Sequence, residues 1–428
     1  MQEPIRIPGP LRLPAAAIAA AVALAACNGG DGRVSPQAVE PLATPAGPGS
    51  QASNLFAAES GAIYLSWIEP TPAGTHALRF SVWQDSAWSS SRTIAEGEDW
   101  FVNWADFPSL IALPDGRLAA HWLERSGSGT YAYGVRIALS GDGGSTWTEP
   151  VVPHDDESQT EHGFVSLFPW TEGRLAAVWL DGRNMTGGHG AAAAGATEEG
   201  GPAMTLRFAV LEGVNGAVEV GPNVLLDGRT CDCCQTDAAL TAAGPIVVYR
   251  DRAIGEVRDI DYRRYVDGEW SASQTVHPDG WVIPACPVNG PAVAADGEQA
   301  VVAWYTAARD TPRVHVAFSA DTARTFGPPV RIDDGSPVGR VDVAYVPGGA
   351  FVVWLEEVED GAEIRGRLVR PGDSLEGEAV TLAASSAARA SGFPRIAVTD
   401  ERLFLTWTDP GEPSRVQVAS LALPLTNR

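Results

Sequence analysis

Apolar and polar residues alternate along most of the chain, in short segments separated by turns. Alternation with a period of two indicates β-strands that bury one face. A longer pattern is superimposed on it: an apolar strand, a short turn, and a second apolar strand that ends in an aromatic residue. This pattern occurs seven times, in residues Asn54–Trp67, Pro108–Trp122, Val165–Trp179, Thr236–Tyr249, Gly290–Trp304, Val341–Trp354 and Pro394–Trp407.

Each unit continues with a third alternating strand, as in Leu78–Trp83, and most add a short fourth strand, as in Glu149–Pro153 and Pro328–Ile332. Four strands in about 50 residues, repeated, are typical of the blades of a β-propeller. The sequence therefore predicts an all-β, seven-bladed propeller. A six-bladed ring is the alternative, but it would leave one aligned aromatic residue unexplained. The longest interval between closing aromatics, from Trp179 to Tyr249, contains a glycine- and alanine-rich run that predicts a loop insertion.

The seventh unit stops after its third strand, Val416–Leu421, close to the C-terminus. We expect residues 34–44, which precede the first unit, to supply the missing fourth strand. Pairing of these two segments would close the ring and remove the free strand edges that an open sheet exposes. The predicted organisation is a leader in residues 1–26, a tether in 27–50 that includes the closing strand, and the propeller in 51–428.

The leader has the features of an export signal. Arg6 and Arg12 provide its positive segment, and the apolar stretch Pro14–Ala26 is too short to span a bilayer. The small residues before Cys27 resemble the lipobox of bacterial lipoproteins, whose cysteine is acylated; an ordinary cleavage site is the alternative. The resemblance implies a cell-envelope protein held at the membrane by a lipid on Cys27. Asn28 after this cysteine favours the outer membrane over the inner membrane.

Acidic residues strongly outnumber basic ones. Asp and Glu total 53 and Lys and Arg total 30, so the formal net charge is -23. A chain of this charge repels a phosphate backbone, and we therefore exclude nucleic acid as a partner. The same charge suits an extracytoplasmic body that binds a cation or a cationic ligand.

One turn between a third and a fourth strand carries a motif. Residues 140–147 read Ser-Gly-Asp-Gly-Gly-Ser-Thr-Trp, and a degenerate copy around Asp321 occupies the equivalent place in the fifth unit. The motif resembles the Asp-box, or BNR repeat, of the sialidase-like β-propeller superfamily. In that family the aspartate accepts backbone N–H groups in a tight turn and the aromatic residue packs between blades. The structural residues implied here are Ser140, Asp142, Gly144, Thr146 and Trp147, with Asp321 in the second copy.

A ring of carboxylates is expected at one end of the propeller. In each unit the first strand begins, and the second strand ends, at the same end of the ring, which we call the rim. Carboxylates at strand ends can serve only to bind backbone N–H groups, or they can form a cation or ligand site at the channel mouth, for a glycan or a protein. The residues two positions after the closing aromatics are Glu69, Glu124, Asp181, Asp251, Thr306, Glu356 and Asp409.

The superfamily resemblance raises the possibility of an exo-α-sialidase, a glycoside hydrolase. Such enzymes clamp a substrate carboxylate with three arginines and use a Tyr–Glu nucleophile pair and an aspartate acid. At the position of the first clamp arginine this chain has Asp106, which cannot hold an anionic sugar. Arg250, Asp251, Arg340 and Asp106 remain as candidate catalytic residues, but no nucleophile pair can be assembled around them. We therefore expect no sialidase activity.

Four cysteines are concentrated on the rim. Cys231, Cys233 and Cys234 directly precede the first strand of the fourth unit, and Cys286 precedes that of the fifth. Disulfides are the first interpretation, because the envelope is oxidising and the number is even. A thiolate site for copper or zinc is the second, and free redox-active thiols are the third. Adjacent cysteines are poorly placed to pair, so we expect one cross-blade disulfide between Cys286 and a member of the triplet.

These observations predict a membrane-anchored binding or assembly module that acts through its cysteine-bearing, carboxylate-rich rim. A sialidase-type glycoside hydrolase and a metal-handling envelope protein, for copper or zinc, are the two alternatives. The sequence does not require a cofactor for the first interpretation.

Overall fold

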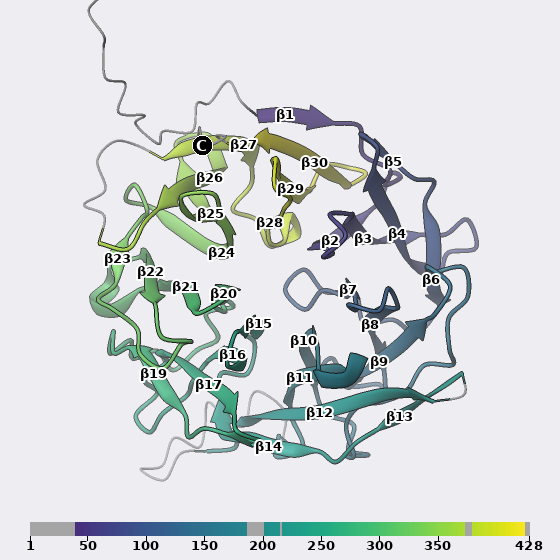
Figure 1. Cartoon of the computed structure of the whole chain (residues 1–428), viewed down its shortest axis with the longest axis horizontal. Coiled ribbons are helices and arrows are strands. Elements are labelled where there is room, and N and C mark those ends of the chain that lie inside the picture. Colours follow the sequence, from purple (N-terminus) through teal and green to yellow (C-terminus); the bar gives the residue numbers. More distant parts are fainter. Residues whose placement is uncertain (1–38, 186–200, 215, 373–378, 424–428) are drawn as a thin grey trace, which may run out of the picture. The chain divides into compact units, whose positions relative to one another are not determined.

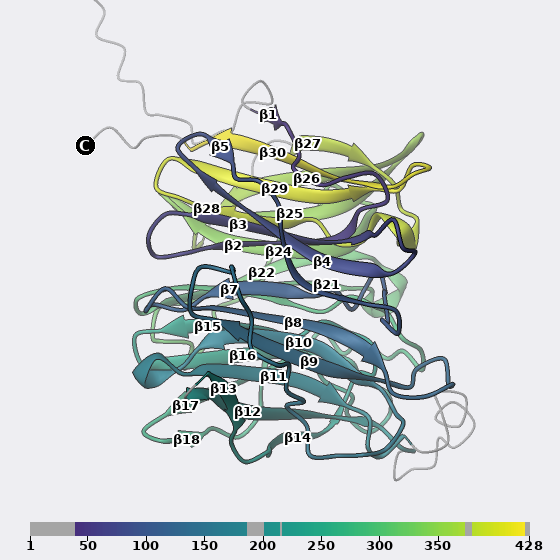
Figure 2. The same cartoon turned by 90° about the vertical axis from the view of Figure 1, so that its right-hand side faces the viewer.

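The alternating segments form seven antiparallel sheets arranged in a ring (Figure 1). The computed structural model describes residues 39–185, 201–214, 216–372 and 379–423. Within this part of the chain the strands run from one face of the ring to the other (Figure 2). The fold is thus a seven-bladed β-propeller, and the six-bladed alternative is wrong because each of the seven aligned units forms its own sheet.

The first three blades follow the chain order from the innermost strand outward. In blades 1 and 3, two further strands follow the third strand, and both of them pair with it. The strands are β2 (Gln51–Ala57), β3 (Ile63–Pro70), β4 (His76–Gln84), β5 (Ala87–Trp88) and β6 (Arg92–Gly97) in blade 1; β7 (Ser109–Ala112), β8 (Leu118–Arg125) and β9 (Tyr133–Ser140) in blade 2; β10 (His162–Pro169), β11 (Leu175–Asp181), β12 (Met204–Val214), β13 (Ala217–Val220) and β14 (Val224–Thr230) in blade 3.

Blades 4 to 7 are built in the same way. Short 3-10 helices connect strands at Thr171–Gly173 in blade 3, at Ala308–Asp310 in blade 5, and at Arg389–Ser391 between blades 6 and 7. The strands are β15 (Asp237–Thr241), β16 (Gly244–Arg250), β17 (Ile260–Val266), β18 (Glu269–Trp270) and β19 (Gln274–His277) in blade 4; β20 (Ala292–Asp296), β21 (Gln299–Thr306), β22 (Arg313–Ser319) and β23 (Val330–Arg331) in blade 5; β24 (Pro337–Val346), β25 (Gly349–Val358), β26 (Gly361–Val369) and β27 (Val380–Ser385) in blade 6; β28 (Arg395–Val398), β29 (Arg402–Asp409), β30 (Arg415–Ala422) and β1 (Val39–Leu42) in blade 7.

Blade 7 joins the two ends of the described chain. Strand β1 pairs antiparallel with β30, with Val39 opposite Leu421 and Leu42 opposite Val418. The backbone N–H of Gly49 also donates to the carbonyl of Ser414, at 2.7 Å. The N-terminal segment therefore supplies the outer strand of the last blade over residues 39–42, while residues 34–38 of the expected strand lie outside the described residues.

The expected fourth strand at Glu149–Pro153 is wrong in its extent. Only Val151 is paired there, in an isolated bridge to Ile137. Pro150 and Pro153 flank this valine and its neighbour, and proline has no N–H to donate, so a ladder cannot extend through either position. In blade 5 the expected strand Pro328–Ile332 is likewise reduced to two residues.

The Asp-box turn in blade 2 is held by the carboxylate of Asp142. Its Oδ1 accepts the backbone N–H of Thr146 at 2.9 Å, and its Oδ2 accepts the Thr146 hydroxyl at 2.7 Å. These hydrogen bonds lower the pKa of Asp142 to about 2. Trp147 packs edge-on against Phe80 of blade 1, with ring centroids 6.3 Å apart. Gly144 lies below the same ring, since an added Cβ would be 2.3 Å from Phe80.

The second copy around Asp321 makes the same contacts. The Asp321 carboxylate accepts the backbone N–H of Thr325 at 3.0 Å and its hydroxyl at 2.7 Å. Both copies thus fix the turn that follows a third strand. No helix among the described residues is long and apolar enough to cross a membrane. Cys27 and the leader lie outside the described residues.

Candidate metal centre

The rim carboxylates serve mainly to hold the buried tryptophans of their own blades. In four blades the indole Nε1 of the closing tryptophan donates to the carboxylate two residues further on, at 2.6 to 3.1 Å. In three of these blades an arginine of the third strand forms an ion pair with the same carboxylate. These carboxylates are engaged inside the blades, so the ring is in large part a repeated structural device. The four pairs are Trp67–Glu69, Trp122–Glu124, Trp179–Asp181 and Trp354–Glu356.

Arg250 ends strand β16 and is buried in the wall of the ring. Its guanidinium donates to the carbonyl of Asn289 at 2.9 Å and to that of Tyr305 at 2.7 Å. A further hydrogen bond goes to the carbonyl of Arg258, and the group lies 4.9 Å from the ring centre of Trp281. Because its donors are used by the backbone, Arg250 is not positioned to clamp the carboxylate of a substrate.

Arg340 is also committed to the fold. It donates to the carbonyl of Gly392 at 2.9 Å and to the hydroxyl of Ser391 at 2.7 Å, and so joins blade 6 to blade 7. Its guanidinium lies 4.7 Å from the ring centre of Trp104. Burial, together with the charge of Arg389, lowers the pKa of Arg340 to about 10. Neither of the two candidate clamp arginines is open to a ligand.

Asp106 and a tyrosine that the sequence interpretation missed form a buried hydrogen-bond chain. The Tyr133 hydroxyl lies 2.8 Å from Oδ2 of Asp106 and 2.6 Å from Oε1 of Glu161. Asp106 Oδ1 accepts the backbone N–H of Phe164, at 2.8 Å. Burial, opposed by these hydrogen bonds and reinforced by the charge of Glu161, raises the pKa of Asp106 to about 8. Asp106 is therefore largely protonated at neutral pH, and the Tyr133 hydroxyl lies between its carboxyl group and that of Glu161.

Tyr133 is closed to substrates, whereas Asp106 borders the small axial cavity described below. Tyr133 has no exposed surface, and its ring stacks on Phe101 with centroids 3.8 Å apart. Gly163 packs directly against the carboxyl group of Asp106, since an added Cβ would be 1.9 Å from Oδ2. The sequence could have indicated the contact between Tyr133 and Glu161, because Tyr133 begins a third strand and Glu161 precedes a first strand on the same rim. Its function here is to fix the rim of blade 2 to blade 3.

The axial channel holds a cavity of about 150 Å³ among the innermost strands. Gln235 contributes to its closure at the rim, because its amide donates to the carbonyl of Ala105 at 2.6 Å and accepts the N–H of Gly290 at 3.0 Å. A larger groove, of about 1610 Å³, is lined by the turns between first and second strands, at the end opposite the rim. The channel mouth expected to hold a glycan is therefore narrow and crossed by side chains.

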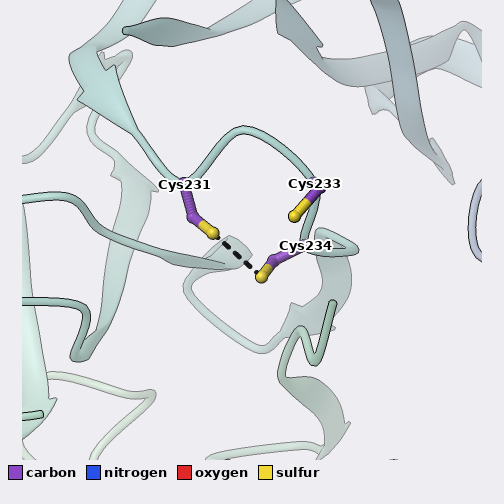
Figure 3. Close-up of side chains that lie close together, drawn as sticks. All are labelled: Cys231, Cys233 and Cys234. Carbon is purple, nitrogen blue, oxygen red and sulfur yellow. Dashed lines mark hydrogen bonds between the residues drawn. The ribbon is translucent and has the colours of Figure 1, made fainter. Parts of the chain in front are cut away.

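Three cysteines converge in the loop between β14 and β15. Cys231 follows β14, and its backbone N–H donates to the carbonyl of Arg250 at 3.0 Å. The sulfurs of Cys231 and Cys234 lie 3.0 Å apart, and one ligand atom each from Cys231, Cys233 and Cys234 lies within 4.8 Å of the others (Figure 3). Cys231 and Cys234 are buried and Cys233 is half-buried. The Cys-x-x-Cys spacing of Cys231 and Cys234, which the sequence interpretation overlooked, was the signal for this pair.

Positive charge surrounds the buried sulfurs. Nη1 of Arg258 donates to Sγ of Cys231 at 3.2 Å, and Arg258 is itself held by Glu256 at 2.7 Å. Burial of Cys231 opposes ionisation, but the two neighbouring thiols, with Cys234 3.0 Å away, and the charge of Arg258 outweigh it. The pKa of Cys231 is therefore well below its usual range. A thiolate at Cys231 accepts a hydrogen bond from the thiol of Cys234, 3.0 Å away.

The acidic residues near this loop face arginines. Asp232 lies 3.2 Å from Nη1 of Arg252, which also pairs with Glu256 at 2.9 Å. Asp251 is half-buried, and burial together with the charge of Asp261 raises its pKa to about 7. Asp232 is thus engaged by Arg252 rather than by the cysteines. The sulfurs are thus the donors of this site.

The disulfide expected between Cys286 and the triplet is absent from the structure, in which the four cysteines of the described residues are free thiols. Cys286 is exposed, whereas Cys231 and Cys234 face each other in the interior with their sulfurs 3.0 Å apart. The expectation failed because spacing along the chain could place all four residues on the rim but could not order them by depth.

A second group of metal-ligating residues lies on blade 3. Asp156, His162 and Asp181 each offer a ligand atom within 4.8 Å of the others. His162 Nε2 is 3.0 Å from Asp156, but Asp181 already accepts two hydrogen bonds from Arg183, at 2.7 and 2.9 Å. The His162 ring also stacks on His154, at 4.0 Å. The arginine leaves this cluster less suited to a cation than the cysteine cluster.

A buried thiol of lowered pKa, close to two other thiols and next to a guanidinium group, can bind a soft metal ion or take part in disulfide exchange. The donor set contains sulfur from Cys231, Cys233 and Cys234. Such a set favours copper(I) and zinc over magnesium, calcium or manganese, which prefer oxygen ligands.

Neither the scan against family models nor the search of curated proteins found a match. Among solved structures, a protein of unknown function from Dyadobacter fermentans DSM 18053 is similar, with TM-score 0.52, 12% identity, and coverage of 90% of this chain and 99% of that one. An alpha-L-arabinanase of Penicillium chrysogenum matches with TM-score 0.45 and 14% identity over 90% and 98% of the two chains. The NanB sialidase of Streptococcus pneumoniae matches with TM-score 0.45 and 10% identity over 90% and 94%. At such identities a likeness to solved structures concerns the fold alone.

Proposed function

We propose that this protein is an extracytoplasmic propeller that binds a soft metal ion, copper(I), through Cys231, Cys233 and Cys234. The observation that carries the proposal is the convergence of three sulfur atoms within 4.8 Å of one another. They come from one loop that is fixed at both ends by strands, β14 before it and β15 after it. Donors held in this way lose little conformational entropy when a metal binds.

The charges at the site support a thiolate-bound cation. A metal held by several thiolates carries net negative charge, which is costly to bury unless positive groups lie nearby. Arg258 donates directly to Cys231, and the charge of Arg250 acts on the same sulfur. These two buried arginines favour a thiolate at Cys231 and would offset part of the negative charge of a metal-bound thiolate group.

The number of buried donors favours copper(I) over zinc. Structural zinc is almost always bound by four ligands in a tetrahedron, whereas copper(I) is satisfied by two or three thiolates. Cys231 and Cys234 are buried and Cys233 is half-buried, so three sulfurs surround one point. Cys286, as the fourth cysteine, is exposed on the outer side and would have to move inward to complete a zinc site.

The surrounding residues support binding in preference to glycoside hydrolysis. Arg250 and Arg340 donate to the backbone, and Asp106 is enclosed with Tyr133. The groups that a sialidase would need are thus occupied. The leader and the lipobox-like sequence at Cys27 lead us to propose further that the protein acts in the cell envelope, with its lipid in the outer membrane.

Titration of the reduced protein with copper(I) under anaerobic conditions, in competition with bicinchoninate, tests the proposal. We expect one copper(I) per chain and loss of tight binding in the Cys231→Ser and Cys234→Ser double variant. Asp142→Asn is the matched control, because it alters an exposed turn far from the cysteines in sequence and should bind like the parent. Absence of stoichiometric binding to reduced protein with four titratable thiols in residues 39–423 would overturn the proposal. Tight binding of zinc but not copper(I) would overturn the choice of ion.

A further inference from the structure

Two of the rim cysteines face each other across a turn. Asp232 and Cys233 form this turn in the loop between β14 and β15, so Cys231 and Cys234 are its first and fourth residues. In a β-turn the Cα atoms of these two positions lie within about 7 Å of each other, a separation that a disulfide can span. Their sulfurs lie 3.0 Å apart and point toward each other (Figure 3). A disulfide bond therefore requires the sulfurs to approach by only about 1 Å, whereas the adjacent Cys233 and Cys234 are poorly placed to pair.

The two sulfurs of this pair have different surroundings. Nη1 of Arg258 donates to Sγ of Cys231 at 3.2 Å, and Glu256 holds the same guanidinium at 2.7 Å. A guanidinium beside a sulfur stabilises the thiolate, which is the nucleophilic form of cysteine. Cys231 is therefore the residue that attacks an oxidant, and Cys234, next to it, is the residue that resolves the product.

Burial restricts the oxidants that can reach the pair. Cys231 and Cys234 expose 0% and 1% of their surface. None of residues 231–236 belongs to a strand, so this loop can open locally without separating a sheet. A small opening admits a molecule the size of hydrogen peroxide but not one the size of a peptide disulfide.

From this arrangement we infer that Cys231 and Cys234 reduce a small hydroperoxide and form a reversible disulfide. Sγ of Cys231 attacks a peroxide oxygen, the O–O bond breaks, and the departing hydroxide takes up the proton of the Cys231 thiol to become water. Sγ of Cys234 then attacks the Cys231 sulfur, the S–O bond breaks, and the second hydroxide leaves as water with the proton of Cys234. Each sulfur loses one electron and the peroxide gains both, so one hydrogen peroxide yields one disulfide and two waters.

The disulfide also changes the metal site. Cysteine binds metal ions as the thiolate, so the oxidised loop keeps Cys233 alone of its three donors. Protein that is oxidised before copper(I) is added should therefore not bind the ion, and a thiol reductant should restore binding. This effect rests on the proposed function, whereas oxidation of the pair needs no metal.

The experiment treats the reduced, metal-free full chain with hydrogen peroxide, removes the peroxide, alkylates the remaining thiols and maps the tryptic peptides by mass. One such peptide, Thr230–Arg250, contains the three loop cysteines and no other cysteine. It should carry three alkyl groups before oxidation and one afterwards, with the other two sulfurs in a bond between Cys231 and Cys234. Oxidised glutathione at the same concentration should form this bond at least tenfold more slowly.

Single variants separate the two steps. In Cys234→Ser the attack takes place but its product is not resolved, so dimedone should trap a sulfenic acid on Cys231. In Cys231→Ser, dimedone should not label the peptide. Cys286→Ser is the matched control, because Cys286 is exposed and lies in another loop, and the pair should oxidise in it at the parent rate. The peptide map of the parent tests the pairing even where a serine variant folds poorly.

The outcomes distinguish the inference from the proposed function. Three alkyl groups after peroxide treatment would show that the pair is inert, and the inference would be wrong whether or not the protein binds copper(I). Oxidation by glutathione disulfide at the rate of peroxide would overturn the choice of oxidant, and a bond to Cys233 would overturn the pairing. Undiminished copper(I) binding by the oxidised protein would refute the effect on the metal site. A disulfide formed in a protein that never binds copper(I) would support the inference and refute the proposed function alone.

Discussion

Replacing Asp106 by asparagine tests whether a proton is held at the rim of the propeller. An asparagine side chain has the shape of a protonated aspartate. Its amide can donate to the Tyr133 hydroxyl, and its carbonyl can accept the backbone N–H of Phe164, which lies 2.8 Å from Asp106 Oδ1. The variant should therefore keep the hydrogen bonds of the neutral acid while losing its titration.

The size of the expected change in the free energy of unfolding follows from the difference in bound protons between the folded and the unfolded state. Burial raises the pKa of Asp106 to about 8 in the folded protein, compared with an ordinary value of 3.8. Between these two pH values the folded state holds one proton more than the unfolded state. The stabilisation that this proton contributes is therefore fully present below about pH 4 and falls as the pH rises toward 8. One proton corresponds to about 1.4 kcal/mol per pH unit. From pH 5 to pH 8, the parent should lose about 4 kcal/mol relative to Asp106→Asn.

The assay is urea-induced unfolding of both proteins at pH 5, 6, 7 and 8, followed by tryptophan fluorescence. The difference between their free energies of unfolding should change steadily in favour of Asp106→Asn as the pH rises. Asp142→Asn is the control: hydrogen bonds lower the pKa of Asp142 to about 2, so its difference from the parent should be flat over this range. A flat difference for Asp106→Asn as well would mean that Asp106 is ionised and that the proposed proton arrangement is wrong.

Three further outcomes are expected. A protein that begins at Ser50 lacks β1 and should melt at a lower temperature than the full chain, because both edges of the ring are then exposed; equal melting would show that the closure is dispensable. The purified protein should not cleave a fluorogenic α-sialoside, and turnover that disappears in Arg250→Ala would contradict this expectation. Gly144→Ala should destabilise the protein by about 1–3 kcal/mol, because its Cβ would lie 2.3 Å from Phe80. Gly143→Ala, with open space around its Cβ, should cost less, and equal losses in urea unfolding would refute the packing argument.

The blades could be predicted from sequence because they depend on local and repeated features. The repeat places Trp67 and Trp179 in the same position of the first and third units, and both are fully buried. Ring closure could also be predicted, since a missing strand at one end of a repeat array must be supplied from elsewhere. The outer strands were less predictable, because they are short and depend on single residues such as Pro150.

The position of the candidate site could be predicted from the sequence, but the arrangement of its side chains could not. All four cysteines were expected on the rim, yet the order of their depth depends on the path of two loops from different blades. The role of Arg250 was also hidden, because it binds the carbonyls of Asn289 and Tyr305, which are distant in the chain. Such contacts have no periodic signal. The buried Tyr133 next to two carboxyl groups was missed for the same reason.

The candidate site lies in the fourth unit, whose residues depart from the repeat, and this departure explains the positive charge beside the cysteines. In six units the closing aromatic is tryptophan, and its next neighbour is uncharged, as with Leu180 and Leu355. In the fourth unit Tyr249 replaces the tryptophan, and Arg250 takes the neighbouring place with its side chain buried. A buried guanidinium is costly unless carbonyls and an anion surround it. The carbonyls come from the adjacent blade, and the anion is the thiolate of Cys231, whose N–H binds the Arg250 backbone. The irregular residues of this blade thus stabilise one another, and together they make the metal-binding proposal more specific than the fold alone could.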